Sequence, residues 1–501
     1  MMKKLLAAIL FSAATLACAA QNSLGGYMQQ LQNDFDQYSD DLKAEHRRFW
    51  QDINREFAEF MARPWTPVRL TEPTPVPVVP EPRPVTIDDD DHGDDIVIIH
   101  RDTVIPVVTV VTPPEPRPQP RPVVPIEDDR KPTPRPVPKY NFTFWGTAAE
   151  VDRPDIEGYN ACDGSRNYSD AWMYLANHNF DRLAIDVLAL RDKHRLCDWA
   201  YIGMLEQLSA SLCYDNNLAQ ILYGFLLSRS GYNFRYLREP VSGMLVIGIA
   251  TDWGLYNRPL YFADNCSFYL PEDCKDIDFE VCDWQMPGAE PVRMAYTRNM
   301  DLSLSPSSER VVPVKYTAAS DTLSARTNTN LITFMNTYPK VFGDGKSPWQ
   351  IVANFPFDSY LRDQLYPQLR RRIERLDEVG AARYLLKVCQ SFPYGYDDKI
   401  WGYDYPLTVE QTWYHLQSDC EDHAIHFSRL VRDLLGLRTV LIYLPGHLVA
   451  GIQFRDHDFE GTYVALGDEQ FLVCDPTYFG ADLGSTFVTT TSDETTVYLL
   501  D

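Results

Sequence analysis

The sequence is short of positive charge and of long apolar runs. Its 46 lysine and arginine residues are outnumbered by 70 aspartate and glutamate residues, which leaves a formal net charge of −24. Such an acidic chain is a poor partner for nucleic acid or for an anionic membrane surface. Beyond the N-terminus no apolar run is long enough to span a bilayer. These absences argue against nucleic-acid-binding and membrane-spanning proteins.

Cysteines are few, and none of those at Cys266, Cys274 and Cys282 forms a Cys-x-x-Cys pair. That spacing is weak for a structural zinc site, so we expect these three residues to staple loops through disulfide bonds. Nine of the 10 cysteines follow residue 20, and an odd number in an exported chain indicates at least one free thiol. The alternative is that all the thiols are reduced core residues or that they pair variably. We expect no metal and no other cofactor.

The N-terminus is typical of an exported protein. A basic stretch at 1–4 precedes an apolar core at 5–17 and a small-residue cleavage site at 18–20. This pattern predicts a signal peptide over 1–20 and a periplasmic or secreted protein. The alternative is a cell-envelope lipoprotein anchored by a lipid at Cys18, although Thr15 fits such a signal poorly.

Residues 21–63 are expected to form an N-terminal amphipathic helix. Apolar residues such as Leu31, Phe35 and Phe57 recur there at helical spacing. Because aromatic residues dominate this stripe, we favour a helix docked on the folded part of the chain over a coiled-coil arm. An inhibitory pro-segment is a third interpretation.

A Pro-rich acidic linker is expected over 64–139, where Pro-Glu-Pro-Arg-Pro occurs at 80–84 and again at 114–118. Such a composition favours extended polyproline II. Within it, residues 96–99 and 104–111 have the composition of two strands that pair with each other or join the edge of a sheet. The acidic run at 88–95 lacks the ligand spacing of a known Ca²⁺ loop, so a solvated linker is preferred.

Three short motifs place a thiol, an imidazole and a carboxylate in the order Cys420, His447, Asp475. Apolar residues after Ala424 follow helical spacing to Gly436, and Asp419 occupies the N-cap position. Cys420 therefore opens a helix, where free N–H groups and the helix dipole favour a thiolate. The following apolar runs predict an antiparallel meander at 439–444, 447–454, 462–466 and 470–474.

These motifs resemble those of the transglutaminase-like superfamily of papain-fold thiol enzymes, of an exported bacterial type. The resemblance covers residues 345–485 and rests on Cys-Glu-Asp opening a helix, Gly-His starting a strand and Asp-Pro-Thr-Tyr closing another. It implies that Cys420 is the nucleophile, His447 the general base and acid, and Asp475 the orienting carboxylate. The family includes peptidases, amidases, cross-linking enzymes and inactive members.

The folded part divides into two related halves. Residues 243–249 match residues 446–452 at five of seven positions, and a helical pattern precedes each stretch. We therefore expect a degenerate transglutaminase-like half at 140–320 before a catalytic domain at 321–501. Asp215 and Met244 would stand where Cys420 and His447 are, so the first half would be inert. Chance similarity between apolar strands is the alternative.

The sequence thus predicts an α+β thiol enzyme of papain-like fold, with an antiparallel sheet in two tandem copies. Its expected partner is a protein or peptide whose amide bonds it hydrolyses, because nothing marks a second, lysine-accepting site. Cross-linking acyl transfer and a catalytically silent binding module remain alternatives. Trp401, Gln411 and Trp413 are candidate second oxyanion donors beside the Cys420 N–H. A metal site formed by Cys420, His423, His426 and Cys474 is disfavoured.

Overall fold

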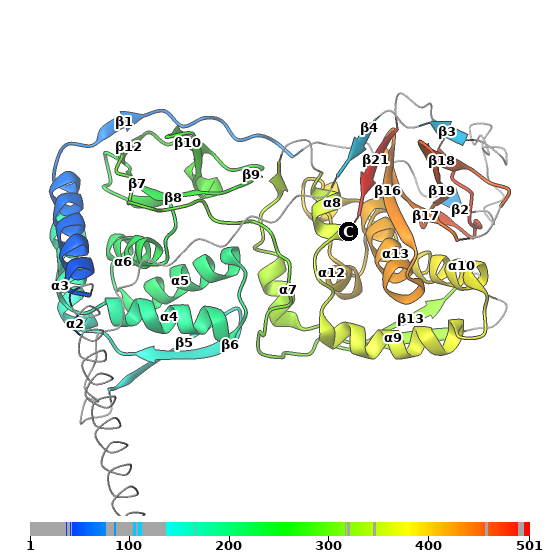
Figure 1. The fold of residues 1–501 in the computed structure, drawn as a ribbon, viewed down its shortest axis with the longest axis horizontal. Coiled ribbons are helices and arrows are strands. Elements are labelled where there is room, and N and C mark those ends of the chain that lie inside the picture. Colours follow the sequence, from blue (N-terminus) through cyan, green and yellow to red (C-terminus); the bar gives the residue numbers. More distant parts are fainter. Residues whose placement is uncertain are drawn as a thin grey trace, which may run out of the picture.

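The structure is a computed structural model that describes residues 37, 41, 43–76, 85–86, 104–106, 109–112, 137–165, 167–315, 317, 321–343, 347–455, 459–488 and 495–500. The expected signal peptide, Cys18 and the acidic run at 88–95 lie outside these ranges. Among the helices described, none is long and apolar enough to cross a membrane. The fold is mixed α+β, with helices packed against two curled sheets (Figure 1).

The first half packs helices against a six-stranded sheet of order β1-β12-β7-β8-β11-β10. It begins with the hairpin β5 (Lys139–Phe144) and β6 (Thr147–Asp152). Its helices are α2 (Ile156–Tyr159), α3 (Tyr168–Asn177), α4 (Asp181–Lys193), α5 (Asp198–Leu212) and α6 (Asn216–Arg229). Its strands are β1 (Thr66–Val68), β7 (Phe234–Arg238), β8 (Leu245–Ala250), β10 (Leu260–Ala263), β11 (Cys266–Tyr269) and β12 (Phe279–Cys282), with β9 (Gly254–Leu255) and the 3-10 turn η1 (Glu272–Cys274) between them.

The second half surrounds a seven-stranded sheet of order β3-β18-β19-β17-β16-β21-β4. Its helices are α7 (Thr329–Met335), α8 (Pro348–Ala353), α9 (Ser359–Ile373), α10 (Glu378–Cys389), α11 (Asp397–Ile400), α12 (Val409–Tyr414) and α13 (Cys420–Leu435). Its main strands are β16 (Arg438–Leu444), β17 (His447–Gln453), β18 (Tyr463–Leu466), β19 (Glu469–Cys474) and β21 (Thr496–Leu499). The hairpin β13 (Arg310–Val314) and β14 (Asp321–Ala325) packs near α9, and β15 (Val341–Phe342) pairs with β9 of the first half.

The predicted helix and the four predicted strands around the Cys, His and Asp motifs are confirmed, but the expected meander is wrong: β19 lies between β17 and β18, because β18 and β19 form a hairpin whose second strand pairs with β17. Helix α13 begins at Cys420, and Gly436 ends it with a left-handed φ of 64°. The four strands after it match the predicted runs to within about one residue at each end. Strand β17 pairs with both β16 and β19, so the strands that carry the two other motifs are neighbours.

The two sheets share one order of connected strands. In the first half α6 leads into β7 and β8, and in the second half α13 leads into β16 and β17. In the first sheet the neighbouring strands are β12, β7, β8, β11 and β10, and in the second they are β21, β16, β17, β19 and β18. Strand by strand, the two series come in the same relative order along the chain. Gly243 and Gly446 both have φ of 74° in the turn before the second strand. Only glycine adopts that conformation without strain, so the same tight turn recurs.

The Pro-rich segment contributes strands to both halves. Besides β1 in the first sheet, β2 (Val85–Thr86) pairs with β20 (Tyr478–Phe479), just after Asp475. Strands β3 (Val104–Pro106) and β4 (Thr109–Val111) join the two opposite edges of the seven-stranded sheet, each in parallel. Of the two arrangements predicted for residues 96–99 and 104–111, addition to a sheet edge is the one observed for 104–106 and 109–111, while residues 96–99 lie outside the described ranges.

The short connection between β3 and β4 shows how strongly this sheet curls. Residues 107–108 are all that separate the two strands, so the opposite edges lie within roughly 11 Å of each other along the chain. Curling of this kind leaves little free edge for pairing with other chains.

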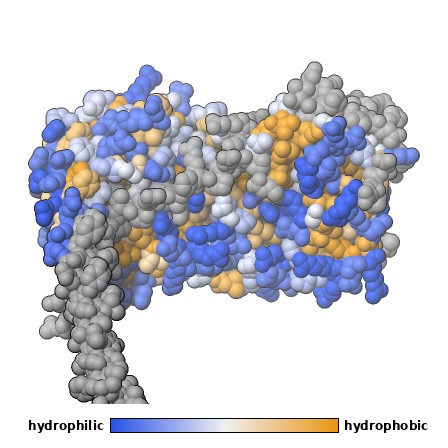
Figure 2. Space-filling model, viewed as in Figure 1, coloured by the Kyte–Doolittle hydropathy of each residue, from blue (hydrophilic) through white to orange (hydrophobic). Residues whose placement is uncertain are grey.

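Figure 2 shows hydrophobic residues gathered near β4 and β21, where Val110 is 46% exposed.

The N-terminal helix docks on the first half, as the aromatic stripe predicts. The described helix runs over 43–61, and the ring of Phe57 contacts that of Trp172 at a centroid distance of 4.6 Å. Phe57, Met61 and Trp65 belong to the same buried core as the helices of the first half. Residues 43–61 therefore form part of that core.

The prediction of disulfide staples is wrong. Across the described chain all nine cysteines from Cys162 to Cys474 are free thiols. Cys282 belongs to the main core of the first half, while Cys274 lies in a separate cluster with Leu237 and Phe279. Cys266 is half-buried, and its sulfur accepts a hydrogen bond from the Asn233 side chain at 3.9 Å. The three thiols are thus held in different surroundings, which equal spacing along the sequence does not reveal.

Candidate active site

Cys420 lies at the first position of α13 and is 2% exposed. The helix start is stabilised by a capping box, in which Asp422 Oδ2 accepts a hydrogen bond from the Asp419 N–H at 3.2 Å. Cys420 shares a buried apolar cluster with Leu441 of β16 and Leu448 of β17. The thiol therefore lies where the helix tip meets the two central strands.

His447 and Asp475 form a buried pair. His447 is the first residue of β17, Asp475 follows the last residue of β19, and Ala450 of β17 is paired with Cys474 of β19. His447 Nε2 lies 2.9 Å from Asp475 Oδ2, and both side chains are almost completely buried. The predicted imidazole and carboxylate are therefore brought together by the pairing of β17 with β19.

Asp475 is held by more donors than His447 alone. Its Oδ1 accepts hydrogen bonds from the Thr477 N–H at 3.0 Å, the Thr477 hydroxyl at 3.0 Å and the Tyr478 N–H at 3.1 Å. Its Oδ2 also accepts one from the Thr486 hydroxyl at 3.0 Å. Burial by itself would raise the pKa of this carboxyl, but His447 and these donors hold the pKa below its usual value. Asp475 is therefore a fixed, ionised partner for the imidazole.

The bond to Asp475 leaves the other ring nitrogen of His447 for different chemistry. His447 Nδ1 is buried and has no hydrogen-bond partner among the described residues. The ring packs against Phe487 at a centroid distance of 4.8 Å, which restricts its rotation. A histidine fixed in this way presents one defined nitrogen for proton transfer.

The thiol of Cys420 donates to its own neighbour in the helix. The sulfur lies 3.3 Å from Glu421 Oε2. Burial and the nearby Asp404 and Asp397 carboxyls raise the pKa of Glu421 well above its usual value. Burial and the neighbouring Glu421 do the same for Asp419. These groups therefore retain protons to higher pH than ordinary carboxyls, which limits the negative charge beside the sulfur.

A buried lysine faces this group of acids. Burial lowers the pKa of Lys340 well below its usual value, although Asp397, Asp404 and Asp422 oppose that shift. The Lys340 ammonium lies over the ring of Tyr405, whose neighbour Asp404 belongs to the same group of acids. Lys340 precedes β15, the strand that pairs with the first half, so the group lies near the junction of the halves.

The described residues contain one set of acids placed closely enough to share a cation. Ligand oxygens of Asp397, Asp419 and Glu421 lie within 4.8 Å of one another, and all three residues are buried. Cation binding requires the ionised carboxylates, whereas burial favours the protonated forms of Asp419 and Glu421. We therefore regard the set as a proton-sharing group.

His423 and His426 belong to the interior of the fold. His426 Nε2 accepts a hydrogen bond from the Trp413 indole at 3.3 Å, so that nitrogen is occupied. Burial lowers the pKa of His423 to about 4 and that of His426 to about 3. Both imidazoles are therefore neutral near pH 7, and the described structure offers no grouping of them with Cys420 and Cys474 around a metal.

Two of the three candidate oxyanion donors are used elsewhere. The Gln411 amide donates to Asn336 Oδ1 at 2.9 Å, and the Trp413 indole donates to His426. Trp401 stacks on Tyr405 at a ring distance of 4.6 Å and is half-buried. Of the three side chains considered, only Trp401 remains a candidate for the second oxyanion donor. The backbone N–H of Cys420 remains the candidate for the first.

Some residues of the site could not be predicted from the motifs. Thr477 follows Asp475 in an Asx-type turn, a signal present in the Asp-Pro-Thr sequence. Thr486 and Gln390 carry no such signal. Gln390 Nε2 donates to the carbonyls of Tyr478 at 2.9 Å and Ala481 at 3.1 Å, which fixes the loop after Asp475 from a distant helix end.

Comparison of the chain with protein-family models, with curated proteins and with solved structures gives no match. The assignment of function therefore rests on the residues and their geometry.

Proposed function

We propose that this chain is an exported thiol enzyme of the transglutaminase-like type that acts on amide bonds of a protein or peptide. The observation that carries the proposal is the buried His447–Asp475 pair, set on adjacent strands against which the helix that begins at Cys420 is packed. A nucleophile, a base and a group that orients the base are the three parts that thiol catalysis requires.

In this mechanism His447 Nδ1 takes the thiol proton as the Cys420 sulfur attacks the carbonyl carbon of the amide. The tetrahedral intermediate collapses when the carbon–nitrogen bond breaks, and the imidazolium returns the proton to the leaving amine. A water molecule then gives a proton to His447 and attacks the thioester. The sulfur leaves, regains the proton and releases a carboxylic acid. Asp475 keeps the ring oriented and stabilises its charged form through Nε2.

We also propose that the two halves are tandem copies of one papain-like fold, the first without a site. The common strand order and the equivalent turns at Gly243 and Gly446 support this reading. In the first half Asp215 caps α6 through the Leu218 N–H at 2.9 Å, and Met244 is 39% exposed. Neither residue supplies a nucleophile or a base.

One observation favours the silent binding module as a second candidate. Cys420 is 2% exposed and its thiol is hydrogen-bonded to Glu421, so a substrate must displace neighbouring groups to reach the sulfur. A module that has kept the fold without chemistry needs no such access. The reactivity of the thiol separates the two candidates.

The deciding experiment is iodoacetamide labelling of the full chain between pH 5 and pH 9, followed by mass spectrometry. We expect rapid labelling of Cys420 at pH 6, and a loss of at least tenfold in rate in His447→Ala. Cys213 and Cys274 are internal controls, because burial raises their pKa to about 12 and about 11. Equal, slow labelling of Cys420 in both proteins would favour the silent module.

The fate of the thioester is tested separately. Glutamine-containing and ordinary peptides are incubated with the enzyme, with and without a fluorescent primary amine, and the products are separated by mass. We expect hydrolysis, and Cys420→Ala is the inactive control. Amine-linked products without hydrolysis would assign cross-linking instead.

Export has its own test. Expression with the native N-terminus in a Gram-negative host should yield a mature chain that begins after Ala20 and is found in the periplasm or the medium. A chain that begins at a diacylglyceryl Cys18 would identify the lipoprotein. A full-length chain in the cytoplasm would contradict both forms of export.

A further inference from the structure

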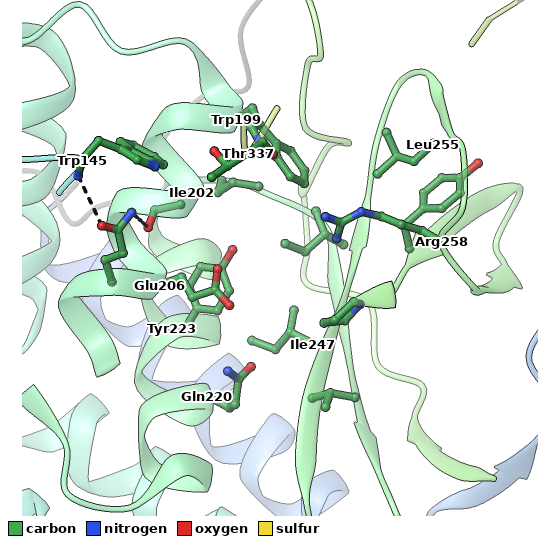
Figure 3. Close-up of a pocket in the computed structure, with 16 residues that line it drawn as sticks. Trp145, Trp199, Ile202, Glu206, Gln220, Tyr223, Ile247, Leu255, Arg258 and Thr337 are labelled. Carbon is green, nitrogen blue, oxygen red and sulfur yellow. Dashed lines mark hydrogen bonds between the residues drawn. The ribbon is translucent and has the colours of Figure 1, made fainter. Parts of the chain in front are cut away.

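The first half contains a cavity of about 240 Å³ between its helices and its sheet. Helices α5 and α6 form one wall, and β8 with the loop after β9 forms the other (Figure 3). For comparison, a cavity volume of about 10–15 Å³ is enough to hold one water molecule. The cavity is therefore large enough for a small organic molecule, and it lies outside the Cys420 site.

Arg258 projects into the cavity from the loop after β9 (Figure 3). Its Nε is buried without a hydrogen-bond partner among the described residues. Its guanidinium lies 5.6 Å from the ring centre of Trp199, which supports the group from one side. Burial lowers the pKa of Arg258, while the nearby Glu272 and Glu206 carboxylates oppose that shift. A guanidinium held in this way matches a carboxylate.

Glu206 projects into the same cavity from α5, on the wall opposite Arg258 (Figure 3). Its carboxyl is exposed to the cavity but surrounded by protein, and this burial raises its pKa, while Arg258 lowers it. A carboxylate on this wall matches an ammonium group.

The rest of the lining is mixed, with apolar side chains beside the polar Gln220 and Thr337 (Figure 3). Ile202 and Tyr223 from the helices and Ile247 from β8 line the space between the two charged groups (Figure 3). Gln207 is already engaged, since its Oε1 accepts from the Trp145 N–H at 3.4 Å. The cavity thus combines one cation, one acid, apolar side chains and the polar Gln220 and Thr337, as ligand sites with a few well-placed polar groups do.

We infer that this cavity binds a small zwitterion with an apolar side chain: an α-amino acid or a whole short peptide. Arg258 would bind the carboxylate, Glu206 the amine, and the apolar lining the side chain. A ligand that carries both charges satisfies both walls at once, whereas a ligand with one charge leaves the other wall unpaired. The inference does not depend on thiol chemistry at Cys420.

The test is isothermal titration of the full mature chain with leucine, phenylalanine and the dipeptides Ala-Leu and Leu-Ala. We expect at least one of these zwitterions to bind. Leucinamide, which lacks the carboxylate, and 4-methylpentanoate, which lacks the amine, should bind at least tenfold more weakly than leucine if leucine is the ligand. Binding of the free amino acids assigns an amino-acid site. Binding of the dipeptides alone assigns a short-peptide site. In that case the dipeptide amides, which lack the carboxylate, and the N-acetyl dipeptides, which lack the amine, replace leucinamide and 4-methylpentanoate as the single-charge probes.

Variants locate the binding. Arg258→Gln and Glu206→Gln should each weaken binding at least tenfold, while Arg371→Gln, at an exposed position of α9, should leave it unchanged. Cys420→Ala should also bind normally, so failure of the thiol chemistry and failure of this site are distinguishable. If Arg258→Gln does not fold, Glu206→Gln and the single-charge ligands still decide. Absence of binding by all four zwitterions at millimolar concentration, or binding insensitive to both folded variants, would overturn the inference.

Discussion

His447 Nε2 lies 2.9 Å from Asp475 Oδ2 in the interior of the second half. His447 starts β17 and Asp475 follows β19, and the two strands are paired, so the contact is built into the register of the sheet. The same contact leaves Nδ1 as the imidazole nitrogen that is not bonded to another described residue. The direction of proton transfer in the proposed mechanism follows from this asymmetry.

Asp475→Asn should uncouple the imidazole from its charge partner while preserving the shape of the site. The amide carries no charge to stabilise the imidazolium and can orient the ring wrongly. We expect iodoacetamide labelling of Cys420 at pH 6 and peptide hydrolysis to fall by about 10²–10⁴-fold, the range of general acid–base contributions. Asp482→Asn, on the surface near the same loop, is the matched control and should change neither rate. An unchanged rate in Asp475→Asn would show that the carboxylate is only structural.

Thr486→Val should remove one donor to Asp475 without changing the volume of the side chain appreciably. The hydroxyl donates to Asp475 Oδ2 at 3.0 Å, and hydrogen bonds to ionised groups contribute about 1.5–3 kcal/mol. We expect the free energy of unfolding to fall by about 1–2 kcal/mol at pH 7, as measured by urea denaturation.

Asp475 also predicts how this effect depends on pH. Its folded pKa is held below the usual value, so its contribution to stability is present above about pH 4 and is lost as pH falls through the folded pKa. The cost of Thr486→Val should therefore shrink in acid. Thr439→Val is the control, because the Thr439 hydroxyl is buried without a hydrogen-bond partner in the described structure, and its loss should cost nothing. Equal costs for the two variants would contradict the prediction.

Glu410→Gln should alter the pH dependence of the free energy of unfolding, because Glu410 acts in the sense opposite to Asp475. Burial, helped by Asp358, raises the pKa of Glu410 to about 7. Between the unfolded value near 4.5 and this folded value, the folded chain holds a proton that the unfolded chain releases, so wild-type stability falls as pH rises. The amide cannot ionise, and the variant should therefore gain up to about 3 kcal/mol relative to wild type between pH 4.5 and pH 8.

The comparison is made by urea denaturation at pH 5, 6.5 and 8. Glu374→Gln is the matched control, because Glu374 is 58% exposed at the end of α9. Its difference from wild type should not change with pH. A constant difference for Glu410→Gln as well would show that Glu410 is ionised throughout this range.

Gln350→Met should loosen the Pro-rich strand from the sheet. Gln350 Nε2 donates to the carbonyls of Val111 in β4 at 2.9 Å and of Leu499 in β21 at 2.8 Å, so one buried amide ties both strands to α8. Methionine fills similar space but leaves two carbonyls without this donor. Hydrogen exchange in residues 104–112 and 495–500 should become faster. Gln364→Met, which acts on the half-exposed end of β14, should leave both segments unchanged.

The local part of the site could be predicted from the sequence. The apolar spacing after Ala424, the stop at Gly436 and the alternation of apolar runs with Gly and Pro all act over a few residues, and they specify α13 and β16–β19. The likeness of the two halves also came from short local matches. Equal spacing of Cys266, Cys274 and Cys282 misled because it says nothing of which face of a sheet each thiol occupies.

By itself the sequence determined which segments become helix and strand around Cys420, His447 and Asp475, because those preferences are local. Tertiary structure alone decided which groups surround them. Strand pairing joined His447 to Asp475, and packing brought the Thr486 hydroxyl to the same carboxylate. It also placed Arg258 opposite Glu206 across a cavity, and β3 and β4 on opposite edges of one sheet. These contacts join residues distant in the chain, so their burial and charge arise only when the chain folds.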